Sequence, residues 1–196
     1  MNKITFQEAG HVYTNEQGVV IPSVSQILQH FGISNYAGVD SGVLARKADL
    51  GTDVHQVCEE YDTDELWAVE PKDAPYLDQW IEFRKKYKFS PFIGVEVPLY
   101  SKTWGFGVTP DRFTGDTLIE IKLTVKQEKS HQIQMAFQKI VVEENFKIKI
   151  KYRLCIYLKK NGYKVVEFKD KMDEQIAKSL VQVYNWKKVN KLNMEG

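Results

Sequence analysis

The chain has 196 residues and a formal net charge of +1, with 43% hydrophobic and 27% charged residues. This composition is ordinary for a globular protein, and it excludes a disordered tail, a fibrous repeat and a polycation that would attract nucleic acid by net charge alone. The two cysteines, Cys58 and Cys155, are too few for a disulfide framework, so we expect a reducing, cytoplasmic compartment.

Membrane insertion and export are not expected from this sequence. The first residues lack the apolar core of a secretory signal, and no stretch approaches the ~20 apolar residues that span a bilayer. We therefore expect no membrane partner. The length fits one folded domain over residues 1–196.

The first part of this domain, residues 1–90, is predicted to contain a hairpin followed by helices. Runs of β-prone residues flank the turn-forming segment Asn15–Gly18, which predicts an N-terminal hairpin. Apolar residues then recur at three- and four-residue intervals, the period of an α-helix. They predict helices over about residues 24–31, 41–61 and 76–87.

The second part, residues 91–168, is predicted to form a sheet core, which a C-terminal helix at 172–190 closes. Three β-rich runs predict an antiparallel meander over residues 92–100, 104–114 and 117–124. A helix near 129–144 and two strands near 150–158 and 163–168 follow. Together these elements predict an α/β or α+β fold in which helices flank a central mixed β-sheet.

Three charged residues at the end of this meander are candidates for chemistry. Glu120 and Lys122 stand two apart on one strand, so their side chains share a face. If the two strands pair through the Gly115–Asp116 turn, Asp111 lies opposite or diagonal to Glu120. Two converging carboxylates suit a hard divalent ion such as Mg²⁺ or Mn²⁺.

A simpler interpretation of these residues is a solvated turn and an exposed sheet face, where Asp and Glu-x-Lys are common. Against it, Glu120 and Lys122 alternate with apolar residues along a strand that is predicted to be buried on at least one face. Charges in such a strand are costly unless they are paired or used. This pattern favours a functional cluster.

These motifs resemble the PD-(D/E)xK nucleases, and within them the RecB-like and phage-type exonuclease branch, over roughly residues 22–168. Gly51–His55 matches the family's Gly-x-x-x-His on a helix. Gly107–Asp111 matches its strand-end aspartate motif with one extra residue, and Glu120–Lys122 matches its Glu-x-Lys. All three occur in the family's order, and the resemblance implies a restriction-endonuclease-like core.

The resemblance also implies roles for individual residues. One or two Mg²⁺ or Mn²⁺ ions would be held by His55, Asp111, Glu120 and the carbonyl group of Ile121. Lys122 would position the attacking water. Glu96, on the strand before Asp111, matches an accessory catalytic acid of some members.

Substrate contacts are implied by the helix that follows and by nearby cations. The family's Gln-x-x-x-Tyr is half matched: Gln134 would touch the substrate backbone. Gln138, which replaces the aromatic residue, is the weaker of the two candidate substrate contacts. Cationic side chains supply most non-specific affinity for nucleic acid. For each nearby cation a solvated surface charge is the more common role, and the candidate phosphate contacts are Arg46, Lys47, Lys126, Lys129 and Lys139.

The function implied by the resemblance is a metal-dependent deoxyribonuclease without an attached helicase. We expect an exonuclease of a phage or bacterium that acts on single-stranded or duplex DNA ends in recombination, repair or genome processing, as a homo-oligomer or with a recombination partner. Two alternatives stay open: an endonuclease on the same fold, and a non-catalytic DNA- or protein-binding relic. The iron–sulfur form of the family needs four cysteines, and this chain has two.

Overall fold

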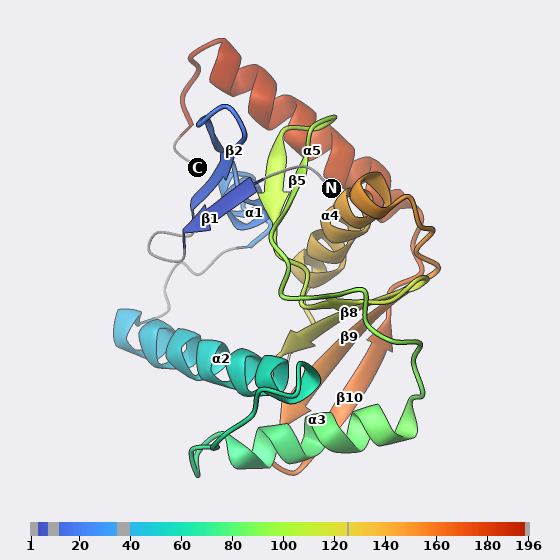
Figure 1. The fold of residues 1–196 in the computed structure, drawn as a ribbon. Coiled ribbons are helices and arrows are strands. Elements are labelled where there is room, and N and C mark those ends of the chain that lie inside the picture. Colours follow the sequence, from blue (N-terminus) through green and yellow to red (C-terminus); the bar gives the residue numbers. More distant parts are fainter. Residues whose placement is uncertain (1–3, 8–11, 35–39, 125, 195–196) are drawn as a thin grey trace.

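A computed structural model describes residues 4–7, 12–34, 40–124 and 126–194. Within these residues, the structure has five helices, a five-stranded sheet that helices cover on both faces, and a three-stranded and a two-stranded sheet beside it (Figure 1). The central sheet contains both parallel and antiparallel pairs. The predicted class, a mixed sheet flanked by helices, is confirmed.

The N-terminal strands form a small antiparallel sheet. It consists of β1 (Ile4–Gln7), β2 (Val12–Asn15) and β3 (Val20–Ile21). The predicted turn joins β2 to β3, where the Asn15 side chain accepts hydrogen bonds from the backbone N–H groups of residues 17 and 19. Helix α1 (Val24–His30) follows, and a capping box at Ser23 fixes its first turn.

Two longer helices come next, close to their predicted ranges. α2 (Ser41–Asp62) begins at an Asp40 cap and runs through Gly51 without a break. α3 (Ala74–Lys86) starts two residues earlier than its apolar pattern predicts. In Figure 1 both lie on one side of the central sheet. Among the helices that the structure describes, none has the length and apolar character needed to cross a bilayer.

The predicted antiparallel meander is present as β4, β7 and β8 (Thr117–Lys122), but its first two runs each split into two strands. They give β4 (Gly94–Val95), β5 (Leu99–Ser101), β6 (Phe106–Val108) and β7 (Arg112–Phe113). Proline, which cannot donate a ladder hydrogen bond, stands in both breaks, as Pro98 and Pro110. β5 and β6 pair with each other, whereas β4 and β7 join the central sheet.

The centre of the sheet is a parallel pair joined by a helical crossover. β8 (Thr117–Lys122) and β9 (Tyr152–Lys159) are parallel, α4 (Lys129–Phe146) connects them, and β10 (Gly162–Glu167) pairs antiparallel with β9. α4 lies on the side opposite to α2 and α3, and α5 (Met172–Val189) packs against α4 (Figure 1).

Alternation along β8 divides its side chains between two cores. Ile119 and Ile121 face α2 and α3, where they pack with Val54, Trp80 and other apolar residues. Leu118 belongs to the core on the α4 side. Because side chains alternate along a strand, Glu120 and Lys122 also point toward α4. This placement puts both charged residues between the sheet and one helix.

Candidate active site

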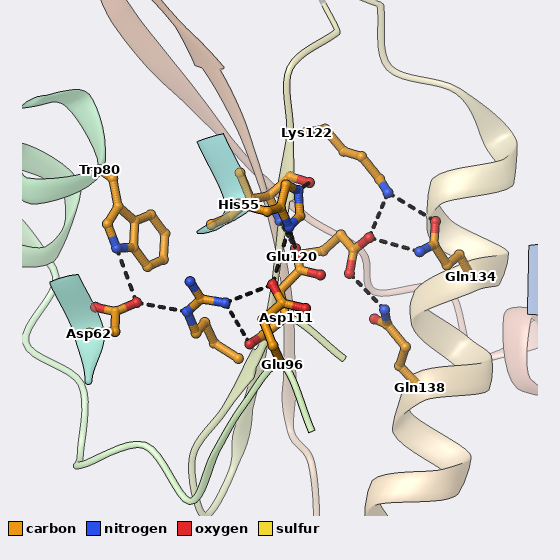
Figure 2. Close-up of polar contacts among 11 residues, drawn as sticks. His55, Asp62, Trp80, Glu96, Asp111, Glu120, Lys122, Gln134 and Gln138 are labelled. Atoms are coloured by element: carbon orange, nitrogen blue, oxygen red, sulfur yellow. Dashed lines mark hydrogen bonds and ion pairs between the residues drawn. The ribbon is translucent and has the colours of Figure 1, made fainter. Parts of the chain in front are cut away.

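His55 lies at the meeting point of several predicted site residues (Figure 2). The second half of α2 places its imidazole against the end of β8. Its Nε2 is 3.2 Å from the carbonyl oxygen of Ile121, and its Nδ1 is 3.2 Å from Glu96 Oε1 and 3.6 Å from Asp111 Oδ2. The structure thus brings together three predicted metal-binding groups, His55, Asp111 and Ile121, with the predicted accessory acid.

The pairing of β7 with β8 determines the position of Asp111. Arg112 faces Ile119 in this register, so Asp111, one residue earlier, stands opposite Glu120. The buried Asp111 carboxylate accepts a 2.6 Å hydrogen bond from the backbone N–H of Ile121. Burial raises the pKa of Asp111, while His55 lowers it and Glu96 raises it further.

Glu96 occupies the break between β4 and β5 rather than the interior of a strand. Its φ is +45°, in the left-handed region that residues with a Cβ rarely adopt. Its backbone N–H donates a 2.8 Å hydrogen bond to the carbonyl oxygen of Asp111. In this conformation the Glu96 side chain contacts His55.

The donor set at this point fits a divalent cation. One ligand atom from each of His55, Glu96 and Asp111 lies within 4.8 Å of the other two. Burial alone would lower the pKa of His55, but the Asp111 and Glu96 carboxylates outweigh it and raise the pKa to about 9. The two carboxylates give this site an excess of negative charge, which favours the protonated imidazole. A hard divalent metal ion would neutralise the same charge.

Glu120 faces a different set of partners in this structure. Lys122 Nζ and Gln134 Nε2 donate hydrogen bonds of 2.6 and 2.8 Å to its Oε1, and Gln138 Nε2 donates one of 2.7 Å to its Oε2. Figure 2 shows both glutamines reaching Glu120 from one helix, α4. Both glutamines, predicted as substrate contacts, therefore hold a buried carboxylate here.

Lys122 is a positively charged donor in this arrangement. Burial would lower the pKa of Lys122, but Glu120 and Asp111 outweigh it and raise the pKa above its ordinary value. The ammonium also donates a 3.1 Å hydrogen bond to Gln134 Oε1. Two of its three donors are thus used, and the third is available to a water or a phosphate oxygen.

The predicted phosphate contacts differ in their exposure to solvent. Arg46, Lys47, Lys126 and Lys129 are exposed. Arg46 precedes His55 on α2 by about two and a half turns, so the two side chains leave the helix on opposite sides. The prediction for Lys139 is wrong: it is 7% exposed and forms ion pairs with Glu143 and Glu174, because it lies on the side of α4 that packs against α5.

Sequence reasoning missed a buried ion-pair network behind the site. Arg112 is fully buried, and its Nε donates a 2.7 Å hydrogen bond to Asp62 Oδ2. Its Nη1 donates to Glu96 Oε1 at 3.0 Å and to the carbonyl oxygen of Asp111 at 2.8 Å. In the sequence Arg112 stands between Asp111 and Phe113, a pattern that does not indicate a buried arginine.

Comparison with known proteins gives a fold relationship. The sequence matches no family model and no curated protein. The structure is similar to the crystal structure of a candidate exonuclease from Eubacterium rectale, with a TM-score of 0.55 and 14% sequence identity. The match covers 87% of this chain and 80% of that chain. The chain therefore shares its α+β fold with that protein.

Proposed function

We propose that this chain is a metal-dependent deoxyribonuclease that hydrolyses phosphodiester bonds, and that it acts as an exonuclease. The observation that carries the proposal is the convergence of His55, Glu96, Asp111 and the Ile121 carbonyl oxygen beside the ammonium of Lys122. The resemblance to nucleases in motif order and the fold shared with a candidate exonuclease support it.

Mg²⁺ or Mn²⁺ would be held by His55, Asp111, Glu96 and the Ile121 carbonyl oxygen, with Glu120 available if it exchanges one of its present donors. When bound, such an ion neutralises charge on the phosphate and makes a coordinated water more acidic. The imidazole must lose a proton before it ligates, because only neutral histidine has a free nitrogen lone pair.

The chain's own contribution to the reaction is orientation and charge. Lys122 holds its remaining N–H toward the attacking water or the scissile phosphate, while Glu120 and Gln134 fix the position of Nζ. The water oxygen bonds to phosphorus as one phosphorus–oxygen ester bond breaks. One water is consumed, and a phosphate monoester and a hydroxyl-terminated strand are formed. Placing charge in a site that excludes water strengthens its effect on the transition state.

We also propose the setting of this activity. DNA ends, single-stranded or duplex, are the substrate, and the exposed cations Arg46 and Lys126 contact the backbone. The process is recombination, repair or genome processing in a phage or bacterium, with a homo-oligomer or a recombination protein as partner. Both cysteines are buried and free of disulfides, which supports the cytoplasm as the compartment.

The test is a cleavage assay on end-labelled linear DNA and on covalently closed circular DNA, with Mg²⁺, Mn²⁺ or EDTA. We expect metal-dependent shortening of the linear substrate, no product in EDTA, and intact circles. Nicked or linearised circles would instead identify an endonuclease on this fold. Inertness toward every substrate in both metals would overturn the nuclease proposal.

A further inference from the structure

Glu96 is held at the site by a residue that lies behind it. Oε1 of Glu96 accepts a hydrogen bond from Arg112 Nη1 at 3.0 Å and lies 3.2 Å from the imidazole of His55. The same Nη1 donates to the Asp111 carbonyl oxygen at 2.8 Å, which the Glu96 N–H also contacts. One guanidinium therefore links the two carboxylate-bearing segments of the metal site.

Arg112 is itself fixed by a second carboxylate, remote from the metal ligands. Asp62, the last residue of α2, accepts the Arg112 Nε hydrogen bond at 2.7 Å, and neither side chain is exposed. Trp80 Nε1 donates to the same oxygen at 3.1 Å (Figure 2). Arg84 pairs with the other oxygen, and the Trp80 ring lies 5.7 Å from the Arg112 guanidinium. This chain of contacts leads from α3 to Glu96 without passing through a metal ligand.

The backbone conformation of Glu96 makes such support necessary. A non-glycine residue at φ +45° persists only where surrounding contacts over-determine it. The contacts here are its N–H to Asp111 and its carboxylate to Arg112. Loss of the Arg112 contact would free Glu96 to relax toward an ordinary conformation, which would turn its carboxylate away from His55.

We propose that the Asp62–Arg112 pair is a positioning unit for the metal site, which holds Glu96 and Asp111 in their ligating geometry. Replacing a residue that orients a metal ligand typically weakens metal affinity by about 10- to 100-fold. Neither Asp62 nor Arg112 belongs to the proposed set of metal ligands. The inference rests on the proposed metal-dependent nuclease, and it assigns a role to residues that no nuclease motif of this sequence contains.

The chain supplies a matched control for removing a buried arginine–aspartate pair. Arg153 Nη2 donates to Asp173 Oδ2 at the same 2.7 Å, with side chains 6% and 1% exposed, and Gln132 donates to the other oxygen of Asp173. Arg153 faces Leu118 on β8, whereas the candidate site is at the Lys122 end of that strand. Asp173→Asn thus removes a comparable pair far from the metal ligands.

The experiment measures Mn²⁺ binding to the full chain by calorimetry and by the electron paramagnetic resonance spectrum of the bound ion. Wild type, Asp62→Asn and Asp173→Asn are compared after circular dichroism shows that each is folded. We expect Asp62→Asn to raise the dissociation constant for Mn²⁺ at least tenfold and to alter the spectrum, and Asp173→Asn to change neither. If Asp62→Asn does not fold, Trp80→Phe, which removes one donor to Asp62 and keeps an aromatic ring at this position, is expected to weaken binding to a smaller extent.

Unchanged Mn²⁺ affinity in Asp62→Asn, equal losses in both asparagine variants, or no Mn²⁺ binding by the wild type would each overturn the positioning role. A Mn²⁺ affinity of Trp80→Phe equal to that of the wild type would also overturn the positioning role. DNA cleavage by the wild type is scored separately. Metal-dependent cleavage with unchanged affinity in Asp62→Asn refutes only the positioning role, whereas the expected affinity pattern without cleavage refutes only the nuclease.

Discussion

His131, in the first turn of α4, makes the stability of this protein sensitive to mild acid. Its Nδ1 accepts a 2.9 Å hydrogen bond from the Tyr157 hydroxyl, and the backbone N–H of Glu128 points to the same nitrogen. A nitrogen that accepts from donors carries no proton, so the imidazole is neutral. Burial lowers the pKa of His131 to about 4, and the Lys122 ammonium contributes to the shift.

The magnitude follows from linkage between protonation and folding. In the unfolded chain the histidine pKa is about 6.5, so the unfolded state takes up a proton first as the pH falls. The stabilisation is fully present above pH 6.5, declines as the pH falls, and levels off below pH 4. One pKa unit corresponds to about 1.4 kcal/mol, so the loss from His131 reaches about 2 kcal/mol at pH 5 and about 3 kcal/mol in total.

Urea unfolding of wild type and His131→Gln at pH 7.5 and pH 5 isolates this contribution. Glutamine is neutral at both values and suits the third helical position of a capping box. Because other groups titrate equally in both proteins, the difference between their losses of unfolding free energy gives the contribution of His131. We expect the wild type to lose about 2 kcal/mol more than the variant over this range. Equal losses in the two proteins would refute the reasoning.

Three further predictions concern the site and the packing around it. Because His55 has a pKa of about 9 and must lose its proton to ligate, Mn²⁺ affinity measured by calorimetry should rise about tenfold per unit between pH 7 and 9; a flat profile contradicts this. Lys122→Ala should slow DNA cleavage by about 100-fold or more in a single-turnover assay, because it removes a charged donor at the reacting phosphate; an unchanged rate would remove Lys122 from the mechanism. Gly107→Ala should lower the free energy of unfolding by about 1–3 kcal/mol in urea, since its Cβ would lie 2.5 Å from Cγ of Tyr13, whereas the control Gly115→Ala, with nothing within 4 Å, should change it little.

The sequence predicts the parts of this fold that periodicity encodes. α2, α4 and α5 follow their apolar repeats closely, and alternation along β8 places Glu120 and Lys122 on one face. The breaks in the meander were missed, although Pro98 and Pro110 stand in them. Proline shows that a ladder cannot continue, but it does not show which strand each half will join.

For the candidate site, the sequence predicted which residues belong to it but not which contacts their side chains make. Motif order indicates that His55, Asp111 and Glu120 belong together, but the direction of each side chain depends on partners that no local pattern names. Glu120 turns to two glutamines on α4, and Arg112 pairs with Asp62, which precedes it by 50 residues. Such long-range pairs arise from packing between elements and leave no spacing rule in the sequence.

The central claim, that the cluster around His55 cleaves DNA, is tested most directly by Asp111→Asn. Asparagine keeps an acceptor for the Ile121 N–H but removes the anionic ligand. Asp116→Asn, in the β7–β8 turn of the same sheet, is the control. With end-labelled linear DNA and Mn²⁺, we predict cleavage by wild type and Asp116→Asn and a rate at least about 100-fold lower for Asp111→Asn. Cleavage by Asp111→Asn at the wild-type rate would contradict the account.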